Sequence, residues 1–112
     1  MSDNAEPARA ELLLIEANYE GSETTIVLDG EFDMTGTELF WAHLSEAVDT
    51  HPESVILDAR DLTFIDSSGL LALLRARDAA VEAGVAFRIS EPSPALRRLA
   101  ELGGVVDLLL AE

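Results

Sequence analysis

Apolar and polar residues alternate in a way that divides the chain into strand and helix segments. Short runs rich in apolar and β-branched residues predict four strands, over residues 11–19, 24–28, 54–59 and 85–90. The run over residues 54–59 is the least polar, which is typical of a central strand that is covered on both faces or flanked by other strands. The polar residues 58–61 predict that the chain leaves the sheet at that point.

Apolar residues at helical spacing separate these strands. The first helix is predicted to begin near Thr35, which has capping-box spacing to Glu38, with Thr37 as an alternative cap, and to end before Pro52. Its apolar stripe comprises Leu39, Phe40, Leu44, Ala47 and Val48. Trp41 lies beside this stripe, where a half-buried packing role is commoner than a ligand platform.

Two further helices follow. The second is predicted to begin at Ser67 and to end at Gly84, with one apolar face shared by Leu70, Leu73, Leu74 and Val81. The third has Ser93 as its N-cap and Pro94 as its first residue, and its inward residues are Leu96, Leu99 and Leu102. Residues 105–110 form either a strand or a fourth helix. With a strand there, the order is β-β-α-β-α-β-α-β, a single α/β domain.

Charge and composition restrict the partners of this 112-residue chain. It has 22 acidic residues against 7 arginines, no lysine and a formal net charge of −15. This balance argues against binding to nucleic acid or to an anionic membrane, and it suits a basic protein partner or simply solubility. No cysteine is present, so disulfides, thiolate zinc sites and cysteine nucleophiles are excluded.

The first ten residues are polar and do not resemble a signal peptide. We expect residues 1–10 to form a flexible N-terminal tail and residues 11–112 to form one domain. No apolar run approaches the roughly 20 residues needed to cross a bilayer. The expectation is therefore a cytoplasmic domain, and no motif in the sequence calls for a cofactor or a metal.

Residues 66–69, with the sequence Asp-Ser-Ser-Gly, mark the candidate site. A helix N-terminus has unpaired N–H groups and the positive end of the macrodipole, which together favour an anion such as phosphate. Three roles are open for Ser67: helix cap, nucleophile or phosphate acceptor. Asp66 either caps the helix or positions the Ser67 hydroxyl, and Ser68 is a second cap or a weaker acceptor. Gly69 either makes room for a partner or permits tight packing of the helix on the sheet.

Enzyme and nucleotide-binding motifs are missing from the sequence. An α/β-hydrolase needs Gly-x-Ser-x-Gly and a histidine after the nucleophile, but Ile65 occupies the first glycine position and both histidines, His43 and His51, precede the serines. A phospho-aspartate receiver needs a lysine, and neither glycine-rich nucleotide motif is present. Asp58 and Asp61 are better explained as solvated charges than as a metal pair. We therefore expect no enzymatic activity.

Residues 55–74, VILDARDLTFIDSSGLLALL, resemble the STAS domain of bacterial anti-sigma factor antagonists. Residues 30–33, Gly-Glu-Phe-Asp, are similar to the turn after that family's second strand, and residues 93–99 are similar to the start of its third helix. The resemblance covers residues 11–110. It implies a STAS-type single domain, with a mixed sheet of about four to five strands and helices packed mainly on one face. The family's C-terminal helix is either absent here or formed by residues 105–110.

The resemblance implies partner switching in bacterial transcription regulation and stress response. In this family the unphosphorylated antagonist binds an anti-sigma factor, which is also a serine kinase, and thereby frees the sigma factor. The kinase phosphorylates the first serine of the motif, here Ser67, and a PP2C-type phosphatase restores the active form. STAS domains also serve as non-phosphorylated binding modules in transporter-associated or stress-signalling assemblies, and this alternative stays open. The oligomeric state is not predicted.

Partner contacts are expected around the serine turn. The predicted contact residues are Glu31, Asp33, Thr63, Ser67, Ser68 and Leu70, and the predicted supporting residues are Asp33, Asp66, Ser68 and Gly69. Asp33 either supports the acceptor turn or only shapes its own loop. Phe64 and Leu70 would form an apolar docking patch if they were exposed. Arg97 and Arg98 are expected to face solvent.

Overall fold

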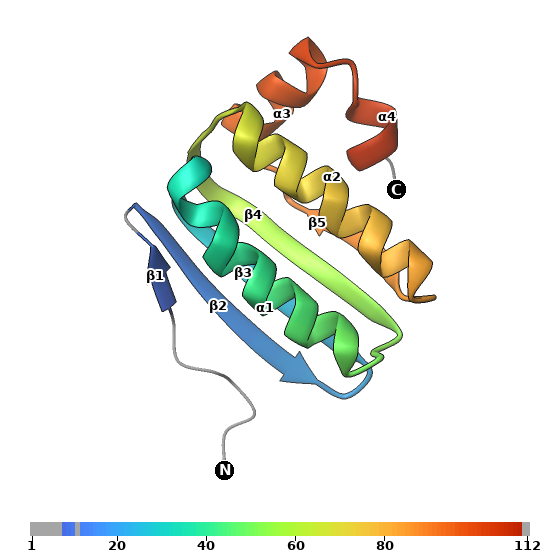
Figure 1. Ribbon diagram of the computed structural model, residues 1–112. Coiled ribbons are helices and arrows are strands. Elements are labelled where there is room, and N and C mark those ends of the chain that lie inside the picture. Colours follow the sequence, from blue (N-terminus) through green and yellow to red (C-terminus); the bar gives the residue numbers. More distant parts are fainter. Residues whose placement is uncertain (1–7, 11, 111–112) are drawn as a thin grey trace.

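A mixed β-sheet and its covering helices make up the fold, in a computed structural model that describes residues 8–10 and 12–110. The elements, in chain order, are β1 (Ala8–Ala10), β2 (Leu13–Glu20), β3 (Glu23–Phe32), the 3₁₀ helix η1 (Met34–Gly36), α1 (Thr37–Asp49), β4 (Ser54–Ile65), α2 (Ser67–Glu82), β5 (Ala86–Ser90), α3 (Pro94–Leu102) and α4 (Val106–Leu109). Figure 1 shows α1 and α2 side by side across the sheet, with α3 and α4 on the far side of α2. The predicted α/β class with a mixed sheet is confirmed.

The five strands follow one another across the sheet in the order β1-β2-β3-β4-β5. β1, β2 and β3 pair antiparallel, whereas β3, β4 and β5 pair parallel. Parallel neighbours need crossover connections, and α1 and α2 provide them. The carboxyl ends of β3 and β4 therefore meet, with Phe32 opposite Ile65. This register brings Asp33 and the serine turn to the same end of the sheet.

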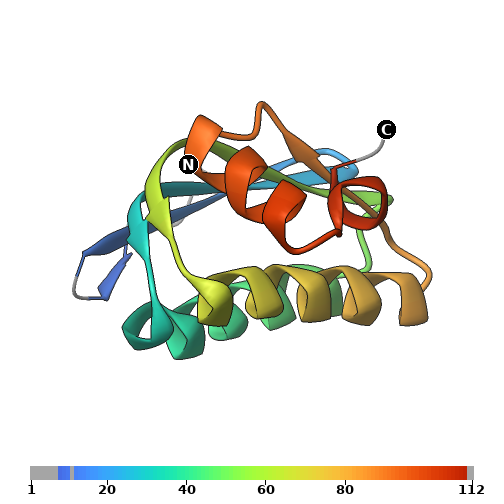
Figure 2. The same cartoon turned by 90° about the horizontal axis from the view of Figure 1, so that it is seen from above.

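The main core lies between the sheet and α1 and α2, which Figure 2 shows together on one side of the sheet. Along β3, Ile26, Leu28 and Phe32 are buried and the residues between them are more exposed, as expected for a strand with one covered face. The rings of Phe32 and Phe40 lie 5.2 Å apart. The predicted stripe of the first helix is confirmed, because its buried residues are Phe40, Leu44, Ala47 and Val48.

Two residues of the predicted apolar helix faces are exposed: Val81 by 59% and Leu102 by 79%. The buried face of α2 is centred on small residues such as Ala72 and Ala76, and Val81 falls outside it. Leu102 follows the buried Leu96 by six residues, so the two lie on different sides of a helix with about 3.6 residues per turn. Both predictions are wrong because the buried faces are narrower than the runs of apolar residues.

Strand β4 is longer than predicted and extends to Ile65. The polar residues 58–61 lie within it, because Leu62 and Ile65 are buried again and pair with the end of β3. Two register shifts in the β3–β4 pairing interrupt the alternation of side chains there. The prediction that the chain leaves the sheet at residues 58–61 is therefore wrong.

Both ends of the described chain also differ from expectation. Ala8–Ala10 form β1 and pair with β2 through backbone hydrogen bonds, so this part of the predicted tail is a strand; residues 1–7 lie outside the described residues. Residues 105–110 contain α4, with Leu109 buried where α4 packs near α2 and α3. The strand alternative is wrong, and the order of elements ends in two helices.

Candidate functional site

The turn between β4 and α2 holds the predicted site. Asp66 has an extended backbone and caps α2, because its Oδ1 accepts a hydrogen bond from the Gly69 N–H at 3.0 Å. The N–H of Asp66 donates to the carbonyl oxygen of Phe32 at 3.2 Å, which ties the turn to the end of β3. Of the two roles open for Asp66, helix capping is the one that its hydrogen bonds perform.

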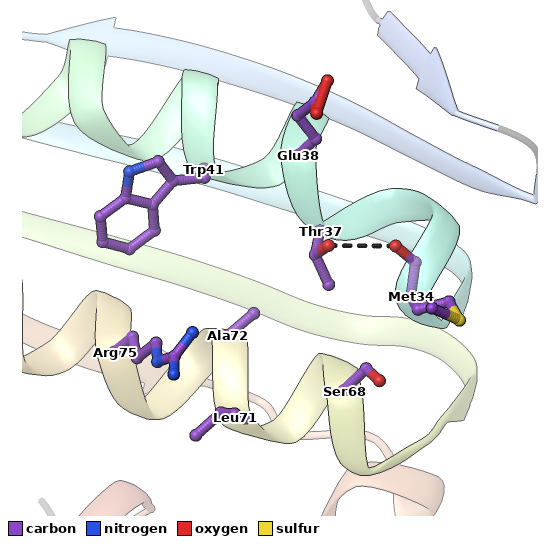
Figure 3. A pocket seen from close by; sticks show the side chains of 8 residues that line it. All are labelled: Met34, Thr37, Glu38, Trp41, Ser68, Leu71, Ala72 and Arg75. Atoms are coloured by element: carbon purple, nitrogen blue, oxygen red, sulfur yellow. Dashed lines mark hydrogen bonds between the residues drawn. The ribbon is translucent and has the colours of Figure 1, made fainter.

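Ser67 is the first residue of α2 and its side chain is exposed. Within the part of the chain that the structure describes, its hydroxyl makes no hydrogen bond; the cap bond comes from Asp66. Ser68 is half-buried and borders the space between α1 and α2 (Figure 3). The first residues of a helix also have N–H groups without intrahelical partners, so donors lie close to any anion carried by Ser67.

Gly69 is buried where the start of α2 crosses the end of β3. A Cβ atom at this position would lie 2.7 Å from the carbonyl oxygen of Phe32 and 2.9 Å from Cγ1 of Ile65. Such contacts are too short to be tolerated without movement of the backbone. The structure therefore supports the packing explanation for Gly69, since a side chain would collide with the chain itself before it met a partner.

Asp33 shapes the neighbouring loop. Its Oδ1 accepts hydrogen bonds from the backbone N–H of Thr35, at 2.9 Å, and from the Thr35 hydroxyl, and it caps η1. These hydrogen bonds lower the pKa of the Asp33 carboxyl, and the bond from the Thr35 hydroxyl has the larger effect. Helix α1 has Gly36 as its N-cap, without a side-chain bond, so the predicted capping box of Thr35 and Glu38 is wrong. The hydrogen bonds of Asp33 are those of a turn-forming residue.

Two other predicted contact residues lie on the paired ends of β3 and β4. Thr63 is exposed, and its hydroxyl donates to the carbonyl oxygen of Gly30 at 3.1 Å. Glu31 is half-buried and stands opposite Phe64 in the parallel register. Gly30 has a φ of +111°, and a Cβ there would meet the carbonyl of Leu12 at 2.2 Å, so glycine is required at this crossing.

The apolar residues near the turn are distributed differently from the prediction. Leu70 is buried, next to Gly103, so the prediction that it contacts a partner is wrong. Its neighbour Leu71 is exposed instead, and Phe64 is exposed as well. Phe64 and Leu102 belong to a shallow pocket of about 300 Å³ between the end of β4 and α3.

A larger groove, of about 600 Å³, lies between α1 and α2 and begins at the serine turn. Its lining residues are Met34, Thr37, Glu38, Trp41, Ser68, Leu71, Ala72 and Arg75 (Figure 3). The Thr37 hydroxyl donates to the Met34 carbonyl oxygen at 3.0 Å, which fixes one end of the groove. This groove was not predicted from the sequence, and Trp41 beside the apolar stripe of the first helix was the one signal that pointed to it.

The other charged residues singled out by the sequence lie apart from the turn. Asp58 forms an ion pair with Arg60 at 3.1 Å, and Arg60 also pairs with Glu91 at 2.8 Å. Arg97 and Arg98 are exposed on α3, as predicted. Among the described residues, no group of three or more His, Cys, Asp or Glu side chains is arranged to hold a metal ion. None of the described helices has the length and apolar character required to span a membrane.

Comparisons with known proteins agree with this fold. Residues 15–111 match the family described as "Mlab, STAS domain". A STAS-domain containing protein of Pseudomonas aeruginosa (strain UCBPP-PA14) is 30% identical over 89 residues, which cover 80% of this chain and 87% of the relative.

Solved structures are similar at lower sequence identity. An anti-sigma factor antagonist from Mycobacterium paratuberculosis has a TM-score of 0.79 at 19% identity, over 91% of this chain and 86% of that one. The anti-sigma factor antagonist SpoIIAA in its unphosphorylated form has a TM-score of 0.73 at 22% identity, over 86% of this chain and 85% of that one. The phosphorylated form of SpoIIAA, from Bacillus, has a TM-score of 0.68 at 22% identity, over 86% and 88% of the two chains.

These likenesses agree with one another on the architecture and on the extent of the domain. The sequence match runs from within β2 to the end of α4, and the structural matches cover most of both chains. The chain therefore belongs to the STAS domain family.

Proposed function

We propose that this chain is a cytoplasmic, non-catalytic anti-sigma factor antagonist. In its unphosphorylated form it binds an anti-sigma factor serine kinase and thereby releases the sigma factor. Phosphorylation of Ser67 by that kinase breaks the complex, and a PP2C-type phosphatase reverses the modification. The contacts proposed around the acceptor are Glu31, Asp33, Thr63 and Ser68.

One observation carries this proposal: Ser67 is exposed at the start of α2 while Asp66 makes the cap hydrogen bond. A serine that caps a helix uses its oxygen to accept a backbone N–H, so moving that serine into a kinase active site breaks a structural hydrogen bond. Ser67 does not cap α2, because Asp66, the residue before it, makes the cap hydrogen bond. Its hydroxyl can enter another protein's active site without loss of a structural hydrogen bond.

Electrostatics supports a local switch. A phosphate on Ser67 would add about −1.5 to −2 charges near neutral pH. The free N–H groups and dipole of α2 stabilise an exposed anion by about 0.3–1 kcal/mol, so the fold tolerates the modification. In an interface the same charge must be desolvated and is repelled by any carboxylate of the partner that faces it, so it opposes binding. Phosphorylation is expected to weaken the complex at least tenfold, a factor that corresponds to about 1.4 kcal/mol.

The comparisons support the same role. The chain shares its fold with two anti-sigma factor antagonists, and SpoIIAA is described in both a phosphorylated and an unphosphorylated form. That protein shows that a domain of this fold can carry the modification. The Asp-Ser-Ser-Gly sequence at the start of α2 contains the serine that we propose as the acceptor in this chain.

The test uses the chain, ATP and an anti-sigma factor kinase from the same genome. Phosphate is mapped by mass spectrometry, and complex formation is followed by gel filtration for wild type, Ser67→Ala and the matched control Ser68→Ala. We expect phosphate on Ser67 in wild type and in Ser68→Ala, with loss of the complex on modification. Ser67→Ala should remain unmodified and bound. Absence of both phosphate and complex with every such kinase would refute the proposal and favour a STAS binding module without phosphorylation.

A further inference from the structure

The groove between α1 and α2 exposes several large apolar side chains at the protein surface. Met34 and Trp41 are exposed by 71% and 42%, and Leu71 by 46%. Three large apolar side chains thus lie together on the surface of a chain with a net charge of −15. Contiguous exposed apolar surface of this kind marks binding sites on soluble proteins.

The groove is continuous with the proposed acceptor site. Ser68 lines it, and Ser67 is the residue directly before Ser68. Figure 3 shows Ser68 and Leu71 on α2, and Trp41 and Met34 across the groove on α1 and η1. A partner that places its active site over Ser67 therefore has the groove beside it. Because an enzyme must hold a substrate protein in a fixed orientation, a second contact next to the acceptor serves the proposed reaction.

The charges around the groove specify the partner further. Glu38 and Arg75 line it, and neither forms a salt bridge with another of the described residues. In the sequence, Asp33 directly precedes Met34 and Asp66 directly precedes the serine pair, and Met34 and Ser68 lie at the same end of the groove (Figure 3). A basic segment is attracted by Glu38 and by the overall negative field, and the Arg75 guanidinium can donate to backbone carbonyl oxygens of that segment.

We infer that the groove between α1 and α2 binds a large apolar side chain carried on a basic segment of the partner kinase. This inference rests on the proposed function and extends its interface from the acceptor serine to Trp41. Trp41 and Leu71 hold the apolar side chain, and Glu38 pairs with a neighbouring Lys or Arg. Tryptophan is enriched among the residues that dominate binding energy in protein interfaces.

The chain itself offers a reporter, because Trp41 is its only tryptophan. Incorporation of 5-fluorotryptophan gives a single ¹⁹F resonance, which tryptophans of the unlabelled kinase cannot obscure. We expect this resonance to shift when the unphosphorylated chain binds the kinase, and to return when Ser67 is phosphorylated. Kd is measured in parallel by calorimetry.

Matched variants on one helix test the contact. Leu71→Glu places a charge in the groove, whereas Val81→Glu adds the same charge at an exposed site of α2 outside the groove lining. We expect Leu71→Glu to raise Kd for the kinase at least tenfold and Val81→Glu to change it less than twofold. Glu38→Gln should raise Kd about threefold and reduce the salt dependence of binding.

The possible outcomes separate this inference from the function on which it rests. A complex that dissociates on Ser67 phosphorylation, but leaves the ¹⁹F resonance and the Leu71→Glu affinity unchanged, overturns the inference and leaves the function intact. A shift that depends on the concentration of this chain alone shows that a second copy covers the groove, and it also overturns the inference. Failure of wild type to bind any such kinase overturns both.

Discussion

The starts of α2 and α3 both contain a serine, and they differ in whether the serine hydroxyl is used to cap the helix. Each helix has a serine at or next to its N-cap position. At α3 the serine is the cap: Ser93 is buried, and its Oγ accepts the Leu96 N–H at 3.2 Å. At α2 the cap is Asp66, and Ser67 is exposed. The serine near the start of α2 is therefore free of a structural hydrogen bond to the described residues because another residue caps the helix.

A carboxylate introduced at each serine tests this difference most strongly. Ser93→Glu removes a cap, at about 1 kcal/mol, and forces a charged group into a buried position, at about 2 kcal/mol or more. We expect it to lower the free energy of unfolding by about 3 kcal/mol. Ser67→Glu places its charge in the exposed first turn and should change stability by less than about 0.5 kcal/mol. Urea denaturation measures both, and equal losses would contradict the comparison.

The next effect concerns the close packing that supports the α2 start. Gly69→Ala adds a Cβ atom 2.7 Å from the Phe32 carbonyl oxygen, and we expect a loss of about 1–3 kcal/mol in the free energy of unfolding. Gly103→Ala, at the C-cap of α3, is the control. There the nearest atom lies at 3.3 Å, so thermal or urea unfolding should show the smaller loss. If Gly69→Ala left the free energy of unfolding unchanged, α2 would be able to move away from β3.

The two N-caps should contribute similarly to the free energy of unfolding. Asp66→Ala and Ser93→Ala each remove one hydrogen bond to a backbone N–H, and each is expected to cost about 1 kcal/mol. Only Asp66→Ala should also alter the rate of phosphorylation at Ser67, because it frees the start of α2. Stability comes from urea titration, and the rate comes from phosphate incorporation over time. An unchanged rate would indicate that the cap does not help to present the acceptor.

The smallest effect is a dependence of stability on pH at Asp33. Its pKa is lowered in the folded protein by the hydrogen bonds from Thr35, so the ionised form is favoured by folding. This contribution is fully present above the unfolded pKa, near 3.9, and is lost as pH falls through the lower folded pKa. The difference in stability between wild type and Asp33→Asn should therefore shrink below pH 4. A difference that is constant from pH 6 to pH 2.5 would contradict it.

Most of the fold was readable because it rests on local patterns. The β2–β3 hairpin, the buried stripe of α1 and the caps of α2 and α3 follow from residue spacing and from polar side chains that accept backbone N–H groups. The errors fall where distant segments meet. Ala8–Ala10 became a strand through pairing with β2, and residues 58–65 stayed in the sheet because β3 continues beside them.

The candidate site was readable to a similar extent. The motif and the exposure of Ser67 could be predicted from the sequence, since the first residue of a helix projects outward. The burial of Leu70 and the exposure of Leu71 were not, because both are leucines at the edge of one helical face. Leu70 lies next to Gly103, at the end of α3, so a segment distant in the sequence contributes to its burial.

The amino-acid sequence by itself determined the order of the main strands and α-helices from β2 to β5, the acidic composition and the position of the Asp-Ser-Ser-Gly turn at the start of α2. Each of these depends on residues within a few positions of one another. Tertiary structure alone decided that Gly69 touches Phe32 and that Met34, Trp41 and Leu71 form one groove beside Ser68. Those contacts join β3, α1 and α2, so they exist only after the parallel pairing of β3 and β4 has brought the ends of both strands together.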